Sequence, residues 1–150
     1  MQYVQLPCGT LSQERVSTCG IPQGSVAGPL LFLIYINDLA NATDLFTILF
    51  ADDTTFQLSY EDPDFLFYKA NLELQRAADW FSANLLTLNA KKTKYILFKN
   101  QNSHLHFGEL LIGGEAIARI GENCEDKSFK FLGHHLDETL SWSHHTNHIF

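Results

Sequence analysis

The chain has 150 residues, the length of one ordinary domain, and 45% of them are hydrophobic, which excludes a disordered chain. Its formal net charge of −7 argues against binding of a polyanion through a generally basic surface. Cys8, Cys19 and Cys124 have no CxxC spacing, so neither a disulfide framework nor a cysteine zinc site is expected. This cysteine usage fits an intracellular protein, in nucleus or cytoplasm.

The first part of the chain predicts a short edge strand, a loop and a helix. The strand is "QYVQL" near the start, and "GIPQGSVAGP" is too rich in glycine and proline to be anything but loop. A helix is expected over "PLLFLIYINDLANA", with Pro29 at its first position. It is apolar nearly all round, which predicts full burial, and a buried strand is the competing interpretation. The run is too short to span a bilayer and the N-terminus lacks a signal peptide, so no membrane association is expected.

A hairpin and a long helix follow. "LFTILF" and "TTFQLSY" predict two strands, with Ala51, Asp52 and Asp53 at the turn between them. The helix is expected over residues 61–86, capped by Asp62 and closed by Asn84. Its apolar stripe at helical spacing consists of Leu66, Ala70, Leu74, Ala77 and Phe81.

The remainder predicts mainly strands. "KTKYILFK" and "FKFLGHHLD" each indicate one strand, and "ELLIGGEAIARI" indicates a hairpin that turns at Gly113 and Gly114. A last helix begins in "LSWSHHTNHIF". Helices and strands are mixed without strict alternation, which predicts an α+β fold.

The adjacent acids Asp52 and Asp53 are the first candidate for chemistry. Mg²⁺ prefers oxygen ligands and usually takes one or two protein carboxylates together with substrate phosphates. Two such ions can hold the attacking and leaving oxygens of a phosphoryl transfer. The alternative is that Asp-Asp simply forms a turn, because aspartate favours turns.

Four motifs carry a family resemblance. "FADD" between two apolar strands is preceded by "GIPQGSVAGPLLFLIYINDL" and followed by "WFSANLLTLNAKKTKYILF" and "FKFLGHHLDETLSW". In this order the motifs resemble those of reverse transcriptases of non-LTR, LINE-type retrotransposons, and they cover essentially the whole chain. The resemblance implies a polymerase palm, an antiparallel sheet with packed helices. It is expected to be incomplete, an interior slice without fingers and without the first catalytic strand.

The resemblance also implies domains and roles. Residues 1–100 would be a palm fragment, and residues 101–150 a hairpin, a primer-grip-like strand and the start of a thumb. Asp52 corresponds to the principal metal ligand and Asp53 to its supporting neighbour. Lys92 of "NAKKTK" would act on the departing pyrophosphate, although Lys91 or Lys94 could serve instead and a solvated basic loop is the alternative. The expected substrate-binding residues are Gln23, Gly24, Phe50 and Ala51, and the expected primer grip is Phe131, Leu132 and Gly133.

The implied reaction is RNA-directed DNA synthesis by a longer parent protein. It transfers a dNMP to a primer 3′-OH with Mg²⁺ (Mn²⁺ is possible), so the partners are an RNA template, a DNA primer and dNTP. No obligate protein partner is evident. The isolated chain is expected to be inactive. The rival hypothesis is a non-catalytic retrotransposon remnant that folds, or binds nucleic acid weakly, and a metal nuclease is a third.

Histidines are concentrated near the end of the chain. Five of the seven lie between His134 and His148. A zinc site is one interpretation of such a cluster. No HExxH pattern occurs, so surface histidines or histidines at the start of a thumb are the favoured interpretation.

Overall fold

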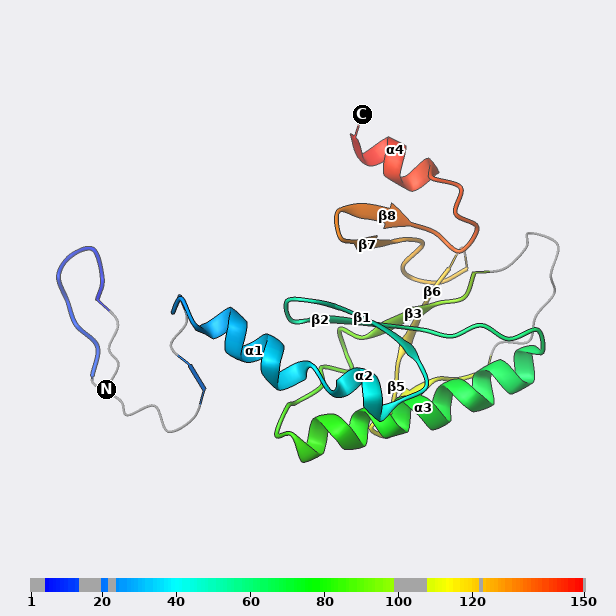
Figure 1. Cartoon of the computed structure of the whole chain (residues 1–150). Coiled ribbons are helices and arrows are strands. Elements are labelled where there is room, and N and C mark those ends of the chain that lie inside the picture. Colours follow the sequence, from blue (N-terminus) through cyan, green and yellow to red (C-terminus); the bar gives the residue numbers. More distant parts are fainter. Residues whose placement is uncertain (1–4, 14–19, 22–23, 99–107, 122, 150) are drawn as a thin grey trace. The chain divides into compact units, whose positions relative to one another are not determined.

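A computed structural model describes residues 5–13, 20–21, 24–98, 108–121 and 123–149. The chain divides into two compact units, Met1–Asn37 and Asp38–Phe150, which are described separately. Figure 1 shows the helices and strands along the chain.

The first unit contains α1 (Gly28–Ile36), in which Pro29 is the second residue and not the first as expected. Before it, Gln5 pairs with Leu11 in an isolated antiparallel bridge, and most of the strand expected at residues 2–6 lies outside the described residues. The prediction that this helix is fully buried is wrong. Only Ile36 is buried, whereas Leu30 is 61% and Ile34 is 65% exposed. Apolar composition makes a helix suitable for burial but does not supply the surface that covers it.

The second unit begins with α2 (Leu39–Ala42), so the single helix expected over residues 29–42 is interrupted at Asn37 and Asp38. Short polar side chains of this kind compete for backbone hydrogen bonds and favour turns. The hairpin of β1 (Phe46–Phe50) and β2 (Asp53–Gln57) follows, and then the long helix α3 (Pro63–Ala83).

The sequence predicted both capping residues of α3 correctly. The Asp62 carboxylate accepts a hydrogen bond from the Asp64 backbone N–H at 3.2 Å, which satisfies one free donor of the first turn. Asn84 is the C-cap, and its N–H donates to the Trp80 carbonyl at 3.0 Å. The structure confirms the helix, although its last regular residue is Ala83 rather than residue 86.

The remaining strands are short. β3 (Lys94–Ile96) pairs in parallel with β6 (Ala118–Ile120), and β4 (Leu111–Ile112) pairs with β5 (Glu115–Ala116) across the expected Gly113–Gly114 turn. β7 (Phe129–Phe131) pairs with β8 (His134–Leu136), and α4 (Ser143–Ile149) ends the described chain. Together with the β1–β2 hairpin, the strands of the described residues form four separate two-stranded sheets.

Two expectations are therefore corrected, and the α+β class is confirmed. The described residues do not form a single antiparallel sheet, since they form separate two-stranded sheets and β3 pairs with β6 in parallel. "FKFLGHHLD" is a hairpin rather than one strand. Leu132 and Gly133 have φ values of 45° and 95°, and positive φ at both central residues is the geometry of a two-residue type I′ turn.

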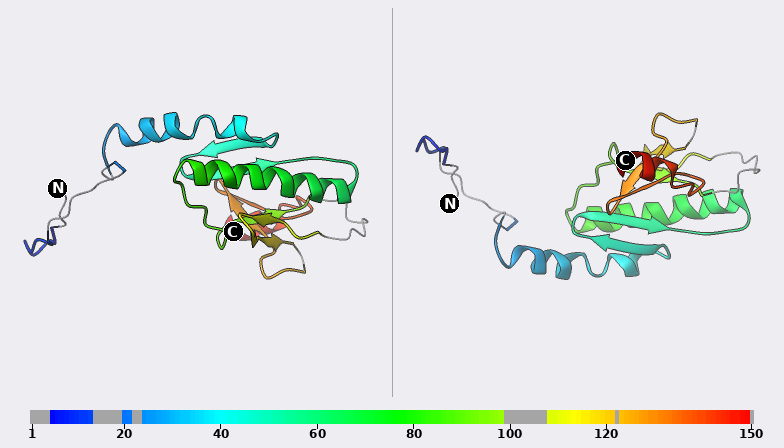
Figure 2. Two further views of the ribbon diagram at one scale, coloured as in Figure 1. Left: turned by 90° about the horizontal axis from the view of Figure 1, so that it is seen from below. Right: turned by 90° about the horizontal axis from the view of Figure 1, so that it is seen from above.

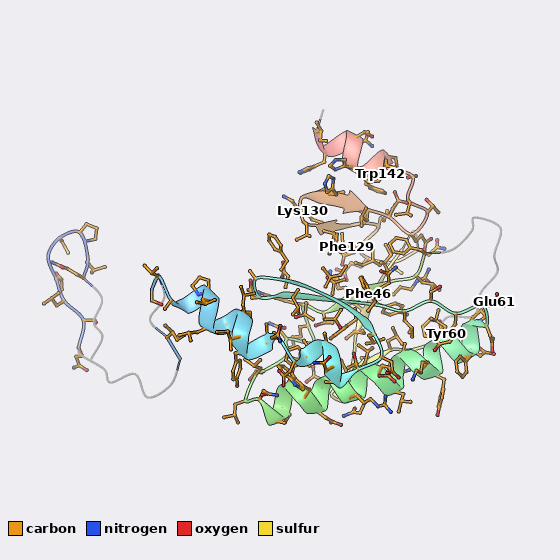
Figure 3. All side chains as sticks on the ribbon, viewed as in Figure 1. Phe46, Tyr60, Glu61, Phe129, Lys130 and Trp142 are labelled. Atoms are coloured by element: carbon orange, nitrogen blue, oxygen red, sulfur yellow. The ribbon has the colours of Figure 1, made fainter. Side chains whose placement is uncertain are left out.

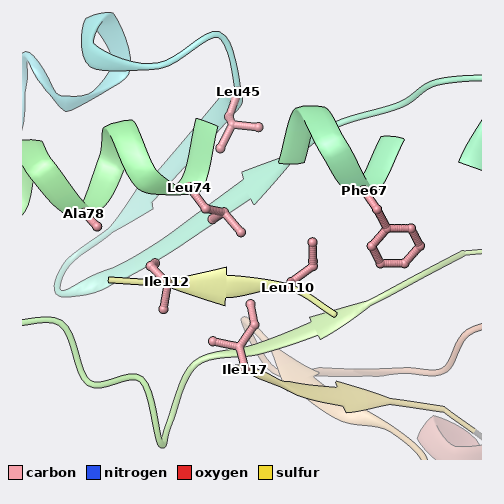
Figure 4. Close-up of a cluster of buried hydrophobic side chains, with 7 residues drawn as sticks. All are labelled: Leu45, Phe67, Leu74, Ala78, Leu110, Ile112 and Ile117. Carbon is pink, nitrogen blue, oxygen red and sulfur yellow. The ribbon is translucent and has the colours of Figure 1, made fainter. Parts of the chain in front are cut away.

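The core of the second unit lies between α3 and the strands. Figure 4 shows its seven buried members, and Figure 2 shows that the β1–β2 hairpin and α3 overlap when seen from below and from above. Phe56 and Leu58, from β2 and the residues after it, pack against this cluster, so the hairpin is attached to α3 through apolar contacts. The buried members are Leu45, Phe67, Leu74, Ala78, Leu110, Ile112 and Ile117.

Candidate functional site

The hairpin of β1 and β2 presents the two acids at its end. Its register pairs Phe46 with Gln57 and Phe50 with Asp53, so Ala51 and Asp52 alone form the turn. The expectation that both acids lie in the turn is corrected in part, because Asp53 is the first residue of β2. Both carboxylates are exposed. Successive side chains of a strand point to opposite faces, so Asp53 and Thr54 diverge, and Thr54 and Phe56 share one face.

Ala51 holds the turn in an uncommon backbone conformation. Its φ is 51°, in the left-handed region, whereas Asp52 is not among the residues with positive φ. This combination matches a type II′ turn, whose first central position favours glycine. A Cβ in this region costs about 1–2 kcal/mol. Backbone strain of this kind is concentrated at functional sites, where the surrounding structure sustains it.

An ion-pair network around one buried carboxylate fixes the entry of the hairpin. The Glu73 side chain on α3 is fully buried, and its Oε2 accepts a hydrogen bond from the Asp44 backbone N–H at 2.9 Å. Its Oε1 lies 2.7 Å from Lys69 Nζ and 2.9 Å from an Arg76 guanidinium nitrogen. Lys69 Nζ also lies 3.0 Å from the Asp44 carboxylate. The residue two positions before β1 is thereby attached to the middle of α3.

The network keeps Glu73 charged. Burial by itself raises the pKa of a carboxyl group, but hydrogen bonds from Lys69 and the Asp44 N–H and the charge of Arg76 outweigh it, so the pKa of Glu73 lies below its ordinary value. No sequence motif identified Glu73. The available signal was its position in the apolar stripe, between Ala70 and Ala77, with basic residues one turn away on either side.

The other residues expected at the nucleotide site lie on different elements. Gln23 lies outside the described residues. Gly24 belongs to the first unit, where it is exposed and has φ of 84°, a value that suits glycine. Phe50 and Ala51 flank the acids at the hairpin end, and Phe50 is 59% exposed.

The lysine loop and the expected primer grip are in the second unit. Lys91 and Lys92 are exposed, and the Lys92 N–H donates to the Asn89 carbonyl at 3.0 Å. Lys94 forms an ion pair with Asp126, which distinguishes it from the other two candidates. In the second hairpin, Phe131 ends β7, and Leu132 and Gly133 form its turn. The placement of these residues does not by itself show whether they have the expected roles.

The donor set at the hairpin end fits part of a magnesium site. Carboxylate oxygens are the ligands that Mg²⁺ prefers, and it commonly takes only one or two of them from a protein. Among the described residues, no group of three or more His, Cys, Asp or Glu side chains is placed to hold a metal ion. Asp52 and Asp53 could therefore hold such an ion together with substrate oxygens, but they do not form a complete site by themselves.

Comparison with known proteins defines the class. The family model described as "Reverse transcriptase (RNA-dependent DNA polymerase)" matches residues 2–136. The match extends over most of the chain and includes the FADD hairpin, α3 and the lysine loop. The chain therefore belongs to the reverse transcriptase family, a family of nucleotidyl-transferring enzymes.

A curated relative narrows the resemblance. The chain is 25% identical over 151 aligned residues to the RNA-directed DNA polymerase from mobile element jockey of Drosophila melanogaster, a non-LTR element of the LINE type. The alignment covers 94% of this chain and 15% of the relative, so the chain spans a small part of that protein's length. The expected family and element type are thus confirmed. No solved structure matches the chain, and no described helix has the length and apolar character needed to cross a membrane.

Proposed function

We propose that the chain supplies one side of the polymerisation site of a non-LTR retrotransposon reverse transcriptase. The reaction is the template-directed transfer of a dNMP to a primer 3′-OH, with an RNA template, a DNA primer and dNTP as partners. The observation that supports it most is the hairpin end, where Asp52 is exposed in a two-residue turn within a chain of this family. A rigid hairpin is a suitable support for a ligand that must be held in place.

In this proposal Asp52 is the principal carboxylate ligand of Mg²⁺, or of Mn²⁺, and Asp53 supports it. Bound divalent ions supply electrostatic stabilisation of the attacking and leaving oxygens. Phe50 and Ala51 lie next to Asp52, where the primer end is expected, and the methyl side chain of Ala51 leaves room for a nucleotide. Gln23 and Gly24 are assigned to the template base and incoming dNTP through the resemblance alone.

The remaining roles concern charge and primer position. Lys92 is exposed, as a cation must be to meet a departing pyrophosphate, and a cation there would stabilise charge on the phosphoryl oxygens. Phe131, Leu132 and Gly133 are proposed to contact the primer from the second hairpin. The proposed domains remain a palm fragment over residues 1–100, with the second hairpin and the start of a thumb over residues 101–150.

The metal-binding step can be tested on the chain itself. Mn²⁺ added to ¹⁵N-labelled protein should broaden the amide signals of residues 51–54 first, because paramagnetic broadening falls steeply with distance. Asp52→Asn should remove this broadening. The adjacent acids Glu61 and Asp62, together with Asp64 at the start of α3, are also exposed and serve as an internal control in the same spectra. Equal broadening at both places would mean that the hairpin has no particular affinity for the ion.

The rival function is a non-catalytic remnant that binds nucleic acid without polymerising. Primer extension by a longer protein that contains this chain, compared with its Asp52→Asn variant, distinguishes the two. Loss of one fixed electrostatic element from such a site commonly lowers the rate by about 10²–10³. Unchanged extension in the variant would remove Asp52 from the mechanism. No extension by either protein, with Mn²⁺ broadening retained, would favour the remnant.

A further inference from the structure

Five histidines gather where α4 meets the β7–β8 hairpin. His134 and His135 belong to β8, and His144, His145 and His148 belong to α4. The ring centroids of His135 and His148 lie 4.5 Å apart, and those of His134 and His145 lie 5.2 Å apart. Figure 1 shows α4 beside β8, and both of these ring pairs join the helix to the hairpin.

The geometry of this contact favours uncharged rings. The His135 backbone N–H points at His145 Nδ1 at 3.4 Å. An imidazolium has no acceptor nitrogen, so a proton on Nδ1 of this ring would abolish the contact. In the described part of the chain, His135 Nε2 is shielded from solvent and has no hydrogen-bond partner. Protonation of His135 would leave a charged N–H there without an acceptor, which is unfavourable.

The charges around His135 have the same sign as its own imidazolium. Lys130 lies directly opposite His135 across the β7–β8 ladder, so the two side chains share a face. Burial lowers the pKa of His135, and His148, Lys130, His145 and His144 lower it further. The nearest acids on the β8–α4 connection are engaged elsewhere. Asp137 accepts from Thr139 and Ser141, and Glu138 lies 2.7 Å from the Arg119 guanidinium of β6.

The connection between β8 and α4 is itself strained. Leu140 and Trp142 have φ values of 55° and 62°, both in the left-handed region that non-glycine residues seldom adopt. Trp142 packs edge-on against the rings of His134 and His145, at 6.3 Å and 5.9 Å between centroids. Figure 3 shows Trp142 before α4 and Lys130 on the hairpin. The strained connection and the ring contacts therefore meet at Trp142.

We propose that α4 and the β7–β8 hairpin form a proton-sensitive clasp, in which α4 is docked while His135 is neutral and is released when His135 is protonated. The sign follows from linkage. A histidine with a lowered pKa in the docked state contributes stability that is complete above its free pKa of about 6.5 and is lost as the pH falls below it. Each histidine that must lose its proton changes the docking equilibrium by up to about tenfold per pH unit.

Nuclear Overhauser contacts between the His135 and His148 rings test the clasp in the 1–150 chain. We expect the contacts at about pH 8 and their loss at about pH 5, while the α3 signals stay in place. In a Trp80→Phe background Trp142 is the one remaining tryptophan, and its fluorescence should change over the same interval. Contacts that persist at pH 5 with both rings protonated would overturn the proposal.

Two variants separate the clasp from a general effect of acid. Lys130→Gln removes the like charge opposite His135 and should move the release to lower pH. Lys127→Gln, at an exposed lysine before β7, is the matched control and should leave the release unchanged. Equal shifts in both variants would contradict the clasp. EDTA should have no effect at about pH 7.5, and loss of docking in EDTA would instead indicate a metal site and overturn the proposal.

Discussion

At the scale of single residues, Ala51 and Asp52 have different constraints although they share one turn. Ala51 is constrained by the backbone, because its φ of 51° disfavours any side chain. Asp52 is exposed, and the stability of the fold makes little demand on its side chain. The positive φ of position 51 is enough to explain a small residue there, without reference to a nucleotide. Turn propensity is compatible with an aspartate at position 52, so the proposed metal role rests on the family and not on the demands of the fold.

Substitutions at Ala51 should separate backbone strain from side-chain contacts. Ala51→Gly should leave the free energy of unfolding unchanged or raise it by up to about 1 kcal/mol, because the strained Cβ is removed. Ala51→Val should lower it by about 1–2 kcal/mol, since a branched side chain fits this φ poorly. Urea unfolding measures both.

The control is Ala83→Gly at the exposed last residue of α3, which should lower the free energy of unfolding by about 0.5–1 kcal/mol. If Ala51→Gly destabilises the chain as much as this control does, Ala51 does not have a left-handed conformation in solution.

At the scale of elements, α3 organises the second unit through both its apolar stripe and Glu73. The hydrophobic cluster attaches the strands to one side of the helix, and the Glu73 network attaches the start of β1. Local sequence signals predicted α3, the FADD hairpin and the Gly113–Gly114 turn, because caps, glycines and periodicity act over a few residues. The parallel pairing of β3 with β6 joins segments far apart in the chain, and no local signal encodes it.

Glu73→Gln should lower the free energy of unfolding by about 2–3 kcal/mol, because Lys69 and Arg76 lose their buried partner. The contribution of Glu73 also depends on pH. Its pKa is lowered in the folded state, so the contribution is complete above the free carboxyl pKa and is lost as the pH falls through the folded pKa.

Thermal unfolding between about pH 7 and 3 measures this pH-dependent contribution of Glu73. On acidification, the Glu73→Gln variant should lose less stability than the parent chain. Asp79→Asn is the control, because Asp79 is exposed and accepts a hydrogen bond from Gln75 on the outer side of α3. Effects of equal size in the two variants would contradict a special role for Glu73.

Asp137 should stabilise the connection to α4. Burial raises the pKa of its carboxyl, but hydrogen bonds from the side chains and backbone N–H groups of Ser141 and Thr139 bring the pKa down to about 2. Asp137→Asn should destabilise this connection by about 1–2 kcal/mol, as loss of a charged cap does elsewhere. The contribution is present above the free pKa near 4 and disappears as the pH falls toward 2.

Hydrogen exchange of the α4 amides measures the effect of Asp137→Asn. Glu125→Gln, at an exposed position, should leave it unchanged. Faster exchange confined to α4 in the Asp137 variant is the expected result. Exchange unchanged from the parent chain would mean that the side chain of Asp137 is dispensable.

At the scale of the whole molecule, family membership was visible from four short motifs, whereas much of the site could not be derived from them. The motifs identify which residues meet substrate in the family. Their mutual distances depend on tertiary contacts and on segments of the relative that this chain does not cover, since it spans 15% of that protein. The exposure of α1 has the same origin, because composition indicates a buried surface without identifying its partner.

Binding of nucleic acid by the 1–150 chain should be weak and sensitive to salt. The net charge of −7 opposes a polyanion, and the few lysines around Lys92 provide the main attraction. We expect a Kd above about 1 μM for a primer–template duplex at physiological salt, and Lys92→Gln should reduce the salt slope by about 1. Fluorescence anisotropy across a salt series measures both. Nanomolar binding would contradict this prediction.

The two-residue turn also restricts which deletions the hairpin can accept during evolution. Thr54, Phe56 and Leu58 alternate along one face of the second strand, and Phe56 and Leu58 pack against the core. Deletion of Ala51 leaves too few residues to reverse the chain, so the pairing must slip by one position. A slip of one position turns every side chain of that strand to the opposite face and exposes these apolar residues. Descendants of this sequence can therefore lose the acid at position 52 by point mutation and still fold. A codon deletion in the turn should remove the folded protein itself.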